Sequence, residues 1–257
     1  HLGIVRCYNW NGSEWIQVGD DIIGGNIVDF NSDGTKVAVC SLENDGNGTT
    51  SGSVSVYNFN GISWEQMGSN ISGASVSLNS NGKKIAIGSP ENNSGHVKIF
   101  EWNANSWVQI GDVINGEDAG DQCGKSVSLN SDGTKVVIGS PSNDSYATDG
   151  GQIRIFEEIS GNWTQQGNSL YGFNTQDYLG NSISTSENGS TVLTVFLHSY
   201  PGEGFYNDGN FSVFSIPTLS CPKPLNITIA LGTILGDTTV LSACDSYNWN
   251  GTILTTT

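Results

Sequence analysis

The sequence predicts an all-β protein built as an array of repeated antiparallel units. The pattern W-x-Q-x-G recurs at intervals of roughly fifty residues, which is the length of one supersecondary unit. Between the copies, short runs alternate between apolar and polar residues with period two, as strands do. The chain holds 34 glycines among 257 residues and is only 13% charged, which suits many turns and few long helices. The motif copies are Trp15-Gln17-Gly19, Trp64-Gln66-Gly68, Trp107-Gln109-Gly111 and Trp163-Gln165-Gly167.

The third copy shows the first two strands of a unit most clearly. Residues 126–129 alternate with period two, and residues 135–141 form a second, mostly apolar run. Asp132-Gly133 lies between them and tolerates positive φ, so a hairpin turn is expected there. The corresponding turn pairs in the other copies are Asp33-Gly34, Asn81-Gly82 and Asn188-Gly189.

A third strand of the form G-x-V-x-V-Y follows a loop of variable length, and its alternation marks one buried face. Its copies begin at Gly3, Gly52, Gly95, Gly151 and Gly209. A tight turn such as Asn60-Gly61 then leads into the strand that carries the tryptophan. Each unit is therefore expected to be a four-stranded antiparallel meander, with strands A, B, C and D in chain order.

Meanders of this length are expected to pack radially as blades of a β-propeller, because radial packing buries both faces of each sheet and leaves only short edges. The alternative is a string of separate small sheets. Against it, every unit carries a tryptophan at the same place, which favours a role in filling the gap between neighbouring blades. The blades are expected near residues 20–68, 69–111, 112–167 and 168–215.

Residues 126–141 followed by Gly151 to Phe156 resemble the FG-GAP repeat of integrin-α-type propellers, and more distantly WD40 blades. The resemblance covers roughly residues 1–215 and implies an extracellular recognition propeller. FG-GAP repeats often carry a calcium loop between their first two strands. The matching loops here keep few carboxylates, so calcium is not expected at these turns; they are residues 31–36, 79–84 and 130–135.

The strands do not divide into whole blades. Strands A, B and D are each recognised four times and strand C five times, and the last unit lacks a recognisable D strand. Either the segment after Cys221 supplies the missing strands, or further blades precede those seen. The second interpretation is preferred, because four blades is the lower end of the usual range.

Prolines 217, 222 and 224 mark a linker after the repeats, so residues 1–216 are expected to form the propeller and residues 217–257 a small β module. Residues 244–252 resemble a short repeat of secreted bacterial surface proteins, which implies that the chain is a piece of a larger surface protein. Cys221 and Cys244 lie in this segment and are a candidate disulfide pair.

The charge of the chain excludes several classes of partner. Twenty-five acidic residues against nine basic ones give a formal net charge of -16, which repels phosphate backbones and anionic membranes. Nucleic acid is therefore not expected as a partner, and no apolar run is long enough for membrane insertion. The acidity and the candidate disulfide favour an extracellular or cell-surface location. The chain begins at His1 without a leader, as expected of a mature or trimmed product.

Sequons of the form Asn-x-Ser/Thr are frequent. They indicate either N-glycosylation or the abundance of Asn, Ser and Thr in turns, and the second explanation is favoured. Both predict surface positions. The candidate asparagines are Asn11, Asn47, Asn70, Asn92, Asn143, Asn162, Asn188, Asn210, Asn226 and Asn250.

The B–C and D–A loops share one rim of the expected propeller and hold most of the irregular carboxylates, so this rim is the candidate binding surface. Two of its loops offer oxygen ligands suited to calcium, the one cofactor considered. Solvated acidic loops are the favoured alternative, since neither loop has EF-hand spacing. The candidate ligands are Glu117, Asp118, Asp121, Asn143, Asp144 and Asp149.

Sequence motifs give catalysis little support. The chain contains no nucleophile elbow, phosphate loop or H-E-x-x-H pattern, and its only arginines are Arg6 and Arg154. We therefore expect a non-enzymatic recognition or adhesion module that binds a protein or a glycan through the loop-rich rim. One alternative is a structural subunit of an extracellular filament or stalk that self-associates through strand edges. A carbohydrate-active propeller enzyme with two distant carboxylates is a further alternative.

Overall fold

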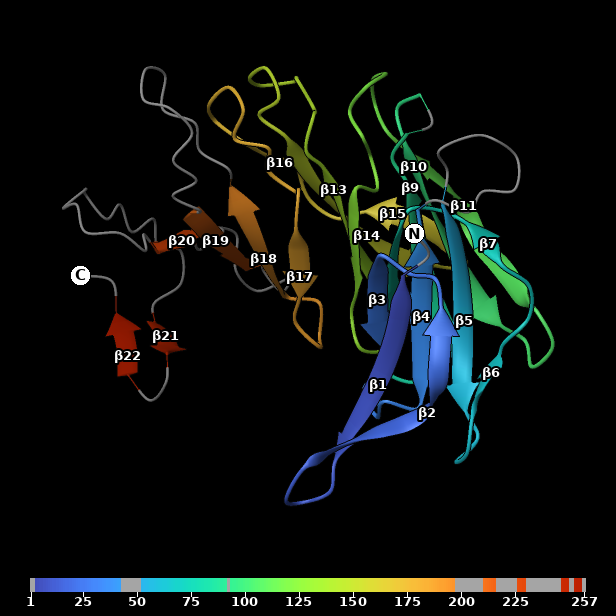
Figure 1. Cartoon of the computed structure of the whole chain (residues 1–257). Coiled ribbons are helices and arrows are strands. Elements are labelled where there is room, and N and C mark those ends of the chain that lie inside the picture. Colours follow the sequence, from blue (N-terminus) through green and yellow to red (C-terminus); the bar gives the residue numbers. More distant parts are fainter. Residues whose placement is uncertain are drawn as a thin grey trace.

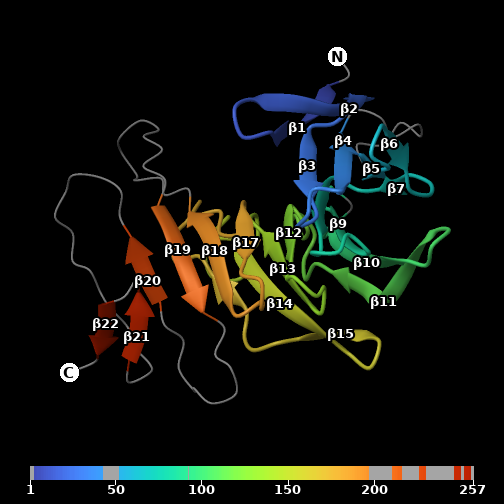
Figure 2. The same cartoon turned by 90° about the horizontal axis from the view of Figure 1, so that it is seen from below.

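The computed structural model confirms the all-β fold class. It describes residues 3–42, 52–91, 93–196, 210–215, 226–229, 246–249 and 252–255, with side chains through residue 195. Every regular element in these ranges is a strand, and the sheets follow one another around an arc (Figures 1 and 2). None of the described segments forms a helix with the length and apolar character needed to cross a bilayer.

A two-stranded hairpin, β1–β2, begins the array, and four antiparallel sheets follow it in chain order. The hairpin is β1 (Ile4–Trp10) and β2 (Trp15–Ile23). Sheet I is β3 (Ile27–Phe30), β4 (Lys36–Ser41), β5 (Ser53–Phe59), β6 (Trp64–Gln66) and β7 (Ile71–Ser72). Sheet II is β8 (Ser75–Leu78), β9 (Lys84–Ser89), β10 (His96–Trp102) and β11 (Trp107–Asn115).

Sheets III and IV repeat the same meander. Sheet III is β12 (Ser126–Leu129), β13 (Lys135–Ser140), β14 (Gln152–Ile159), β15 (Asn162–Gln165) and β16 (Leu170–Tyr171). Sheet IV is β17 (Ile183–Thr185), β18 (Thr191–Phe196), β19 (Asn210–Ser215) and β20 (Asn226–Ile229). A last hairpin consists of β21 (Ser246–Trp249) and β22 (Thr252–Thr255). The predicted order of strands A to D is thus observed, with D broken into two short pieces in sheets I and III.

The fourth strand of sheet IV comes from beyond the expected linker. Strand β20 pairs antiparallel with β19, with Phe214 opposite Asn226. The segment after Cys221 therefore does supply a D strand, which was the less favoured of the two interpretations of the strand count. The division of the chain at residue 216 into two domains stays a prediction.

The tryptophan of the repeated motif joins each of sheets I, II and III to the unit that precedes it. The indole Nε1 of Trp64 donates a hydrogen bond to the carbonyl oxygen of Val18, at 2.9 Å. In the same way, Trp107 donates to Met67 at 2.9 Å and Trp163 donates to Ile110 at 3.1 Å. These three rings pack between sheets as predicted. Trp15 differs, because it lies on the first hairpin and is 67% exposed.

The glycine and the glutamine of the motif have distinct roles. Each motif glycine has a φ between +67° and +70°, a left-handed conformation that favours glycine. A Cβ atom at Gly19 would lie 2.7 Å from the ring of Trp64, so the glycine also makes room for the neighbouring tryptophan. The glutamine two residues before each glycine donates from Nε2 to the glycine carbonyl, as in Gln66 to Gly68 at 3.1 Å.

Backbone hydrogen bonds link the A–B turns of successive sheets. These turns lie on the rim opposite the B–C and D–A loops. The amide of Ser32 donates to the Ser80 carbonyl, that of Ser80 to Ser131, and that of Ser131 to Glu187, at 2.8–3.0 Å. The turns have the predicted geometry, since their glycines all have positive φ. These four bonded turns form the turn ladder of the array. The apolar core lies between the sheets. Several of its side chains, Ile85 among them, are less than 2% exposed.

Candidate functional site

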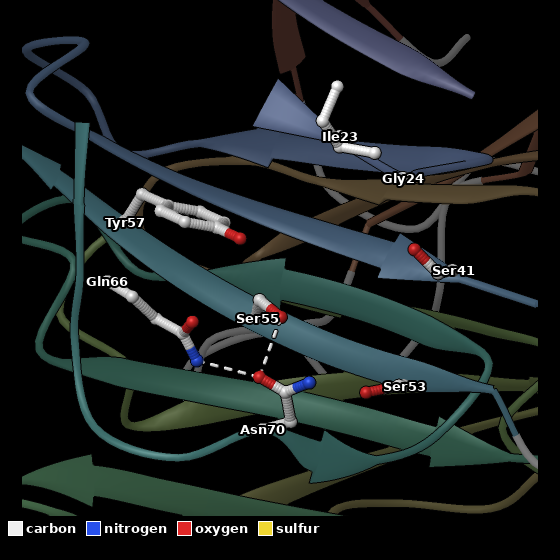
Figure 3. Close-up of a pocket in the computed structure, with 8 residues that line it drawn as sticks. All are labelled: Ile23, Gly24, Ser41, Ser53, Ser55, Tyr57, Gln66 and Asn70. Carbon is white, nitrogen blue, oxygen red and sulfur yellow. Dashed lines mark hydrogen bonds between the residues drawn. The ribbon is translucent and has the colours of Figure 1, made fainter. Parts of the chain in front are cut away.

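A polar cleft of about 180 Å³ opens between hairpin β1–β2 and sheet I (Figure 3). The hairpin contributes the end of β2, and sheet I contributes strands β4, β5 and the outer segment that begins at β6. None of the lining side chains is charged. The lining residues are Ile23, Gly24, Ser41, Ser53, Ser55, Tyr57, Gln66 and Asn70.

Asn70 is held in a fixed orientation in this cleft. Its Oδ1 atom accepts one hydrogen bond from Ser55 Oγ at 2.9 Å and another from Gln66 Nε2 at 2.7 Å. The amide nitrogen of Asn70 consequently points away from both donors (Figure 3). Because the oxygen is already engaged, the group that Asn70 presents is the nitrogen, which is a hydrogen-bond donor.

The alternation of strand β5 explains why the cleft exists. Val54 and Val56 are at most 1% exposed and face the core, whereas Ser53, Ser55 and Tyr57 lie on the other face. The two serines are short, so they leave space beside the hairpin. In sheet III the equivalent strand, β14, has the large side chains of Gln152 and Arg154 at the corresponding places, and both are buried.

The lining groups can recognise a neutral polar ligand. Hydroxyl groups both donate and accept hydrogen bonds, and side-chain amides offer one acceptor and two donors. A volume of 180 Å³ corresponds to about six water molecules at roughly 30 Å³ each. The cleft can therefore take a small polyhydroxylated group, on the scale of a single sugar ring.

The structure brings two of the predicted calcium ligands together. Asp121 and Asn143 are 3% and 1% exposed, and Asn143 Nδ2 donates to Asp121 Oδ2 at 2.8 Å. The same oxygen accepts a hydrogen bond from the backbone amide of Asp118 at 3.1 Å. Asp121 thus connects two loops of the rim and holds both in place.

Glu117 belongs to a different network, between sheets II and III. Its Oε2 accepts from Gln152 Nε2 at 3.0 Å, and its Oε1 lies 4.0 Å from Arg154 Nη1. Arg154 also donates from Nη2 to the Asn115 carbonyl at 2.8 Å and to the buried thiol of Cys123 at 3.2 Å. These contacts fill the interface that corresponds to the open cleft.

The remaining predicted ligands, Asp144 and Asp149, form a local turn. Asp144 Oδ1 accepts from the Asp149 amide at 2.6 Å, and Asp149 has a φ of 51°. The six candidates therefore divide among three separate contact networks. Within the described ranges, no group of three or more His, Cys, Asp or Glu side chains is placed to hold a metal ion. Calcium binding by these loops stays a prediction.

The sequon asparagines differ in exposure. Asn11, Asn70, Asn162 and Asn188 are exposed. Asn143 is buried, and the nitrogen that would carry a glycan already donates to Asp121, contrary to the expected surface position. Asn47, Asn92, Asn250, Cys221 and Cys244 lie outside the described residues, as do the side chains of Asn210 and Asn226.

The other three cysteines are buried free thiols in the interfaces between sheets. They are Cys7, Cys40 and Cys123. Burial raises the pKa of Cys40 to about 11, so this thiol stays protonated and unreactive at neutral pH.

A second hollow, of about 220 Å³, lies where the A strands end on the rim of the turn ladder. It was not predicted, because the acidic loops indicated a binding surface on the opposite rim. Its lining is mixed polar and apolar, with Glu187 as the only charged residue. The lining residues are Phe30, Ser32, Leu78, Ser80, Leu129, Asn130, Ser131, Thr185, Ser186 and Glu187.

No family model and no curated protein sequence matches the chain. Solved structures do resemble it, and two of them are the following β-propeller-type folds. Hydrazine synthase of Kuenenia stuttgartiensis aligns with a TM-score of 0.57 and 14% identity, over 89% of this chain and 60% of that one. TolB of Acinetobacter baumannii aligns with a TM-score of 0.50 and 12% identity, over 88% of this chain and 57% of that one.

These likenesses show the fold alone, because identity is low. The chain spans about 60% of the length of the hydrazine synthase chain that it matches. The fold is therefore a β-propeller type, and any activity has to be argued from the residues of this chain.

Proposed function

We propose that the chain is a non-enzymatic recognition module whose cleft between hairpin β1–β2 and sheet I binds a neutral glycan. The observation that supports this most directly is the lining of the cleft, which consists of hydroxyl and amide side chains without any charged group. A sugar offers alternating donors and acceptors, and such a lining can satisfy both.

The chemistry of the cleft favours binding over glycoside hydrolysis. Hydrolysis by the usual route needs two carboxyl groups flanking the scissile bond. The described lining residues include no carboxyl group, whereas Ser55, Tyr57 and Asn70 offer hydrogen bonds of the kind that orient a bound sugar. Tyr57 also offers a ring face against which the apolar side of a sugar can pack.

The setting proposed for this module is the cell surface or the extracellular space. The resemblance to FG-GAP repeats, the net charge of -16 and the frequent sequons support that location. Its partners would then be glycans on a surface, or proteins that carry them, with adhesion as the biological role. The cleft lies toward the loop-rich rim, which the sequence predicts as the binding surface, since Ser41 and Ser53 are at the ends of the strands that border the B–C loop.

A glycan array probed with the full chain tests the proposal, followed by titration calorimetry with the strongest hit. The variant Tyr57→Phe removes one hydroxyl from the cleft and is expected to weaken binding roughly two- to tenfold, which is the value of one hydrogen bond. Ser55→Arg fills the cleft and is expected to abolish binding.

Tyr8→Phe is the matched control, because Tyr8 occupies the same strand position on the hairpin but lies outside the cleft. It is expected to bind as the unchanged chain does. The proposal fails if the array gives no hit, or if Ser55→Arg binds the hit with unchanged affinity. Repeating the titration with a chelator shows whether calcium contributes.

A further inference from the structure

The A–B turn of sheet IV departs from the sequence that the other three turns share. The turns of sheets I to III read Asn-Ser-Asp-Gly or Asn-Ser-Asn-Gly, whereas the turn of sheet IV reads Ser-Glu-Asn-Gly, from Ser186 to Gly189. Glu187 thus stands where each of the other turns has a serine. The geometry of the turn is kept, because Gly189 has a φ of +66° and the Ser131 amide donates to the Glu187 carbonyl at 2.8 Å. The shape of the turn therefore does not account for the glutamate.

Both departures of sheet IV from the repeat face the second hollow, of about 220 Å³, where the A strands end. The A strands β3, β8, β12 and β17 lie side by side on the inner side of the arc (Figure 2), so each sheet contributes equivalent residues. Leu78 and Leu129 end two of these strands, are 6% and 7% exposed, and give the hollow an apolar floor. Sheet IV has Thr185 in place of the leucine and Glu187 in place of the serine.

The hydroxyl groups that line this hollow present acceptors more than donors. Ser32 Oγ donates to the Ser80 carbonyl at 3.0 Å, and the hydroxyls of Ser80 and Ser131 share one hydrogen bond at 2.6 Å. The hydroxyls of Thr185 and Ser186 donate to groups of their own sheet, at 3.1 and 2.8 Å. A hydroxyl oxygen whose proton is engaged can still accept a hydrogen bond. The hollow is therefore suited to a ligand that donates hydrogen bonds.

Glu187 adds a negative charge to this set of acceptors. It is exposed and is the only charged residue of the lining. Lys135 crosses the same turn, since a Cβ at Gly189 would lie 2.8 Å from its Cδ atom. Its ammonium nitrogen, however, lies 4.0 Å from Glu157 Oε1 on the neighbouring strand. The net charge of -16 also favours a cation over an anion.

We propose that this hollow binds a primary ammonium group on an aliphatic chain, as in the side chain of lysine. An ammonium group has three N–H donors and no acceptor, which matches the Glu187 carboxylate and the hydroxyl oxygens of Ser80 and Ser131. The aliphatic chain would pack on Leu78 and Leu129. A volume of 220 Å³ corresponds to about seven water molecules at roughly 30 Å³ each, which is room for such a chain and its head group.

This inference does not depend on the glycan proposal. The hollow lies on the rim of the turn ladder, the cleft lies toward the opposite rim, and the two share no lining residue. They also differ in chemistry, because the cleft has a neutral lining and the hollow has a carboxylate.

Titration of the isotope-labelled full chain with Nα-acetyl-lysine methylamide, followed by amide NMR shifts, tests the proposal. We expect saturable shifts at the Ser80 and Ser131 amides, with a dissociation constant on the order of 1 mM, because a single side chain makes few contacts. Acetylation of the Nε atom removes the charge of the ligand and is expected to weaken binding about tenfold or more. Added salt is expected to weaken binding as well, since it screens the charges.

Two ligands separate the possible sources of the ammonium group. The n-butylammonium ion carries the same head group and chain without a peptide. Equal affinity for both ligands supports a free amine as the natural ligand, and tighter binding of the lysine derivative supports a lysine of a protein partner.

Variants of Glu187 test the role of its charge. Glu187→Gln keeps the size of the side chain and is expected to weaken binding about tenfold, the value of a hydrogen bond to a charged group. Glu187→Ser restores the residue of the other three turns, so it is expected to fold and to lose binding to a similar extent. Glu91→Gln is the matched control, because Glu91 is exposed on a B–C loop of the opposite rim and its loss changes the net charge equally. This variant is expected to bind like the unchanged chain.

Three outcomes would overturn the proposal. The first is the absence of saturable shifts at the Ser80 and Ser131 amides with either amine. The second is equal affinity for the lysine derivative and its Nε-acetylated form, since the hollow would then not recognise a cation. The third is equal weakening by Glu187→Gln and Glu91→Gln, which would trace binding to the net charge of the chain. Circular dichroism verifies that each variant is folded.

Discussion

The contact of the hairpin with sheet I and the contact of sheet II with sheet III are built by the same motif, but the first holds a polar cleft and the second is filled by large buried side chains. In both, a tryptophan donates to a backbone carbonyl of the preceding unit: Trp64 in the first and Trp163 in the second. The outer strands are thus held together in the same way in both places. The difference arises on strand C, where β5 and β14 have different side chains.

On β5 the positions that face the preceding unit are occupied by Ser53 and Ser55, and on β14 by Gln152 and Arg154. Arg154 is 6% exposed and fills its interface with hydrogen bonds to the preceding loop. The comparison teaches that the tryptophan contact fixes the spacing of the sheets, which leaves the strand C positions free to vary. Small polar residues at these positions open a site, and large ones close it.

The largest expected effect is the difference in stability between the variants Trp64→Ala and Trp15→Ala. Trp64→Ala removes a ring that packs between two units and is expected to lower the free energy of unfolding by about 3 kcal/mol. Trp15→Ala, in the same motif position on the exposed side of hairpin β1–β2, removes a ring contact with Trp10 and is expected to lower it by less than about 1 kcal/mol. Urea denaturation followed by circular dichroism measures both, at a concentration where the chain is monomeric. Equal losses would contradict the assignment of Trp64 as a contact between units.

The next largest effect on stability is expected from emptying the interface between sheets II and III, which Arg154 fills. Arg154→Ser removes the guanidinium that donates to the Asn115 carbonyl and is expected to destabilise the fold by about 2 kcal/mol, because hydrogen bonds from charged groups are the stronger ones. Glu117 loses its nearby cation, but its side chain is 42% exposed and water screens it. Urea denaturation gives the loss.

Arg6→Ser is the control for that measurement. Arg6 occupies the equivalent place on β1, but it forms an exposed ion pair with Asp21 at 2.9 Å, so its removal is expected to leave stability unchanged. If both arginine variants are equally stable, the buried network around Arg154 does not contribute as argued.

The smallest effect concerns the contact of sheet I with sheet II. Asp29 Oδ2 accepts from the Leu78 amide at 2.6 Å, whereas the next interface uses Ser77 Oγ for the same bond to Leu129, at 3.1 Å. Burial, the largest influence, raises the pKa of Asp29. The folded pKa therefore exceeds the unfolded value of about 3.9, and stability is lost as pH rises through the folded pKa.

Asp29→Asn keeps an acceptor for the Leu78 amide and removes the buried charge. We expect this variant to be more stable than the unchanged chain at pH 7, by less than either loss above, and equally stable at pH 3, where Asp29 is protonated in both states. Thermal unfolding at the two pH values measures the difference. A gain that persists at pH 3 would mean that charge burial is not its cause.

Local patterns predicted most of the strands and turns. The runs at 126–129 and 135–141 correspond to β12 and β13, because period-two alternation and an Asp-Gly turn are local signals. A strand at residues 226–230 was predicted as part of the small β module, and β20 confirms it. Its pairing with β19 as the fourth strand of sheet IV is a tertiary event that local patterns do not specify. Local chemistry therefore specifies the unit, while the completion of a sheet depends on a partner far along the chain.

The cleft was harder to predict than the fold. Its walls, Ile23 and Ser55, belong to different units, and their proximity follows from how the tryptophan contact sets one unit against the next. One available signal was the pair of serines on β5, at positions where β14 has larger residues. The composition of the acidic loops indicated calcium ligands, but Asp121 accepts hydrogen bonds from Asn143 and from the Asp118 amide. Composition alone does not reveal whether a carboxylate is free.

The turn ladder also bears on how the chain reaches its fold. Its bonds connect residues about one repeat apart, 48 positions from Ser32 to Ser80 and 51 from Ser80 to Ser131. No bond of the ladder requires the two ends of the chain to meet, so folding can start at any sheet and propagate to its neighbours. The entropic cost of closing the loop between two neighbouring turns is modest and is about the same for each pair of sheets, because the loops have similar lengths. The rate of folding should therefore depend on the best single pair of sheets, and hardly on the length of the array.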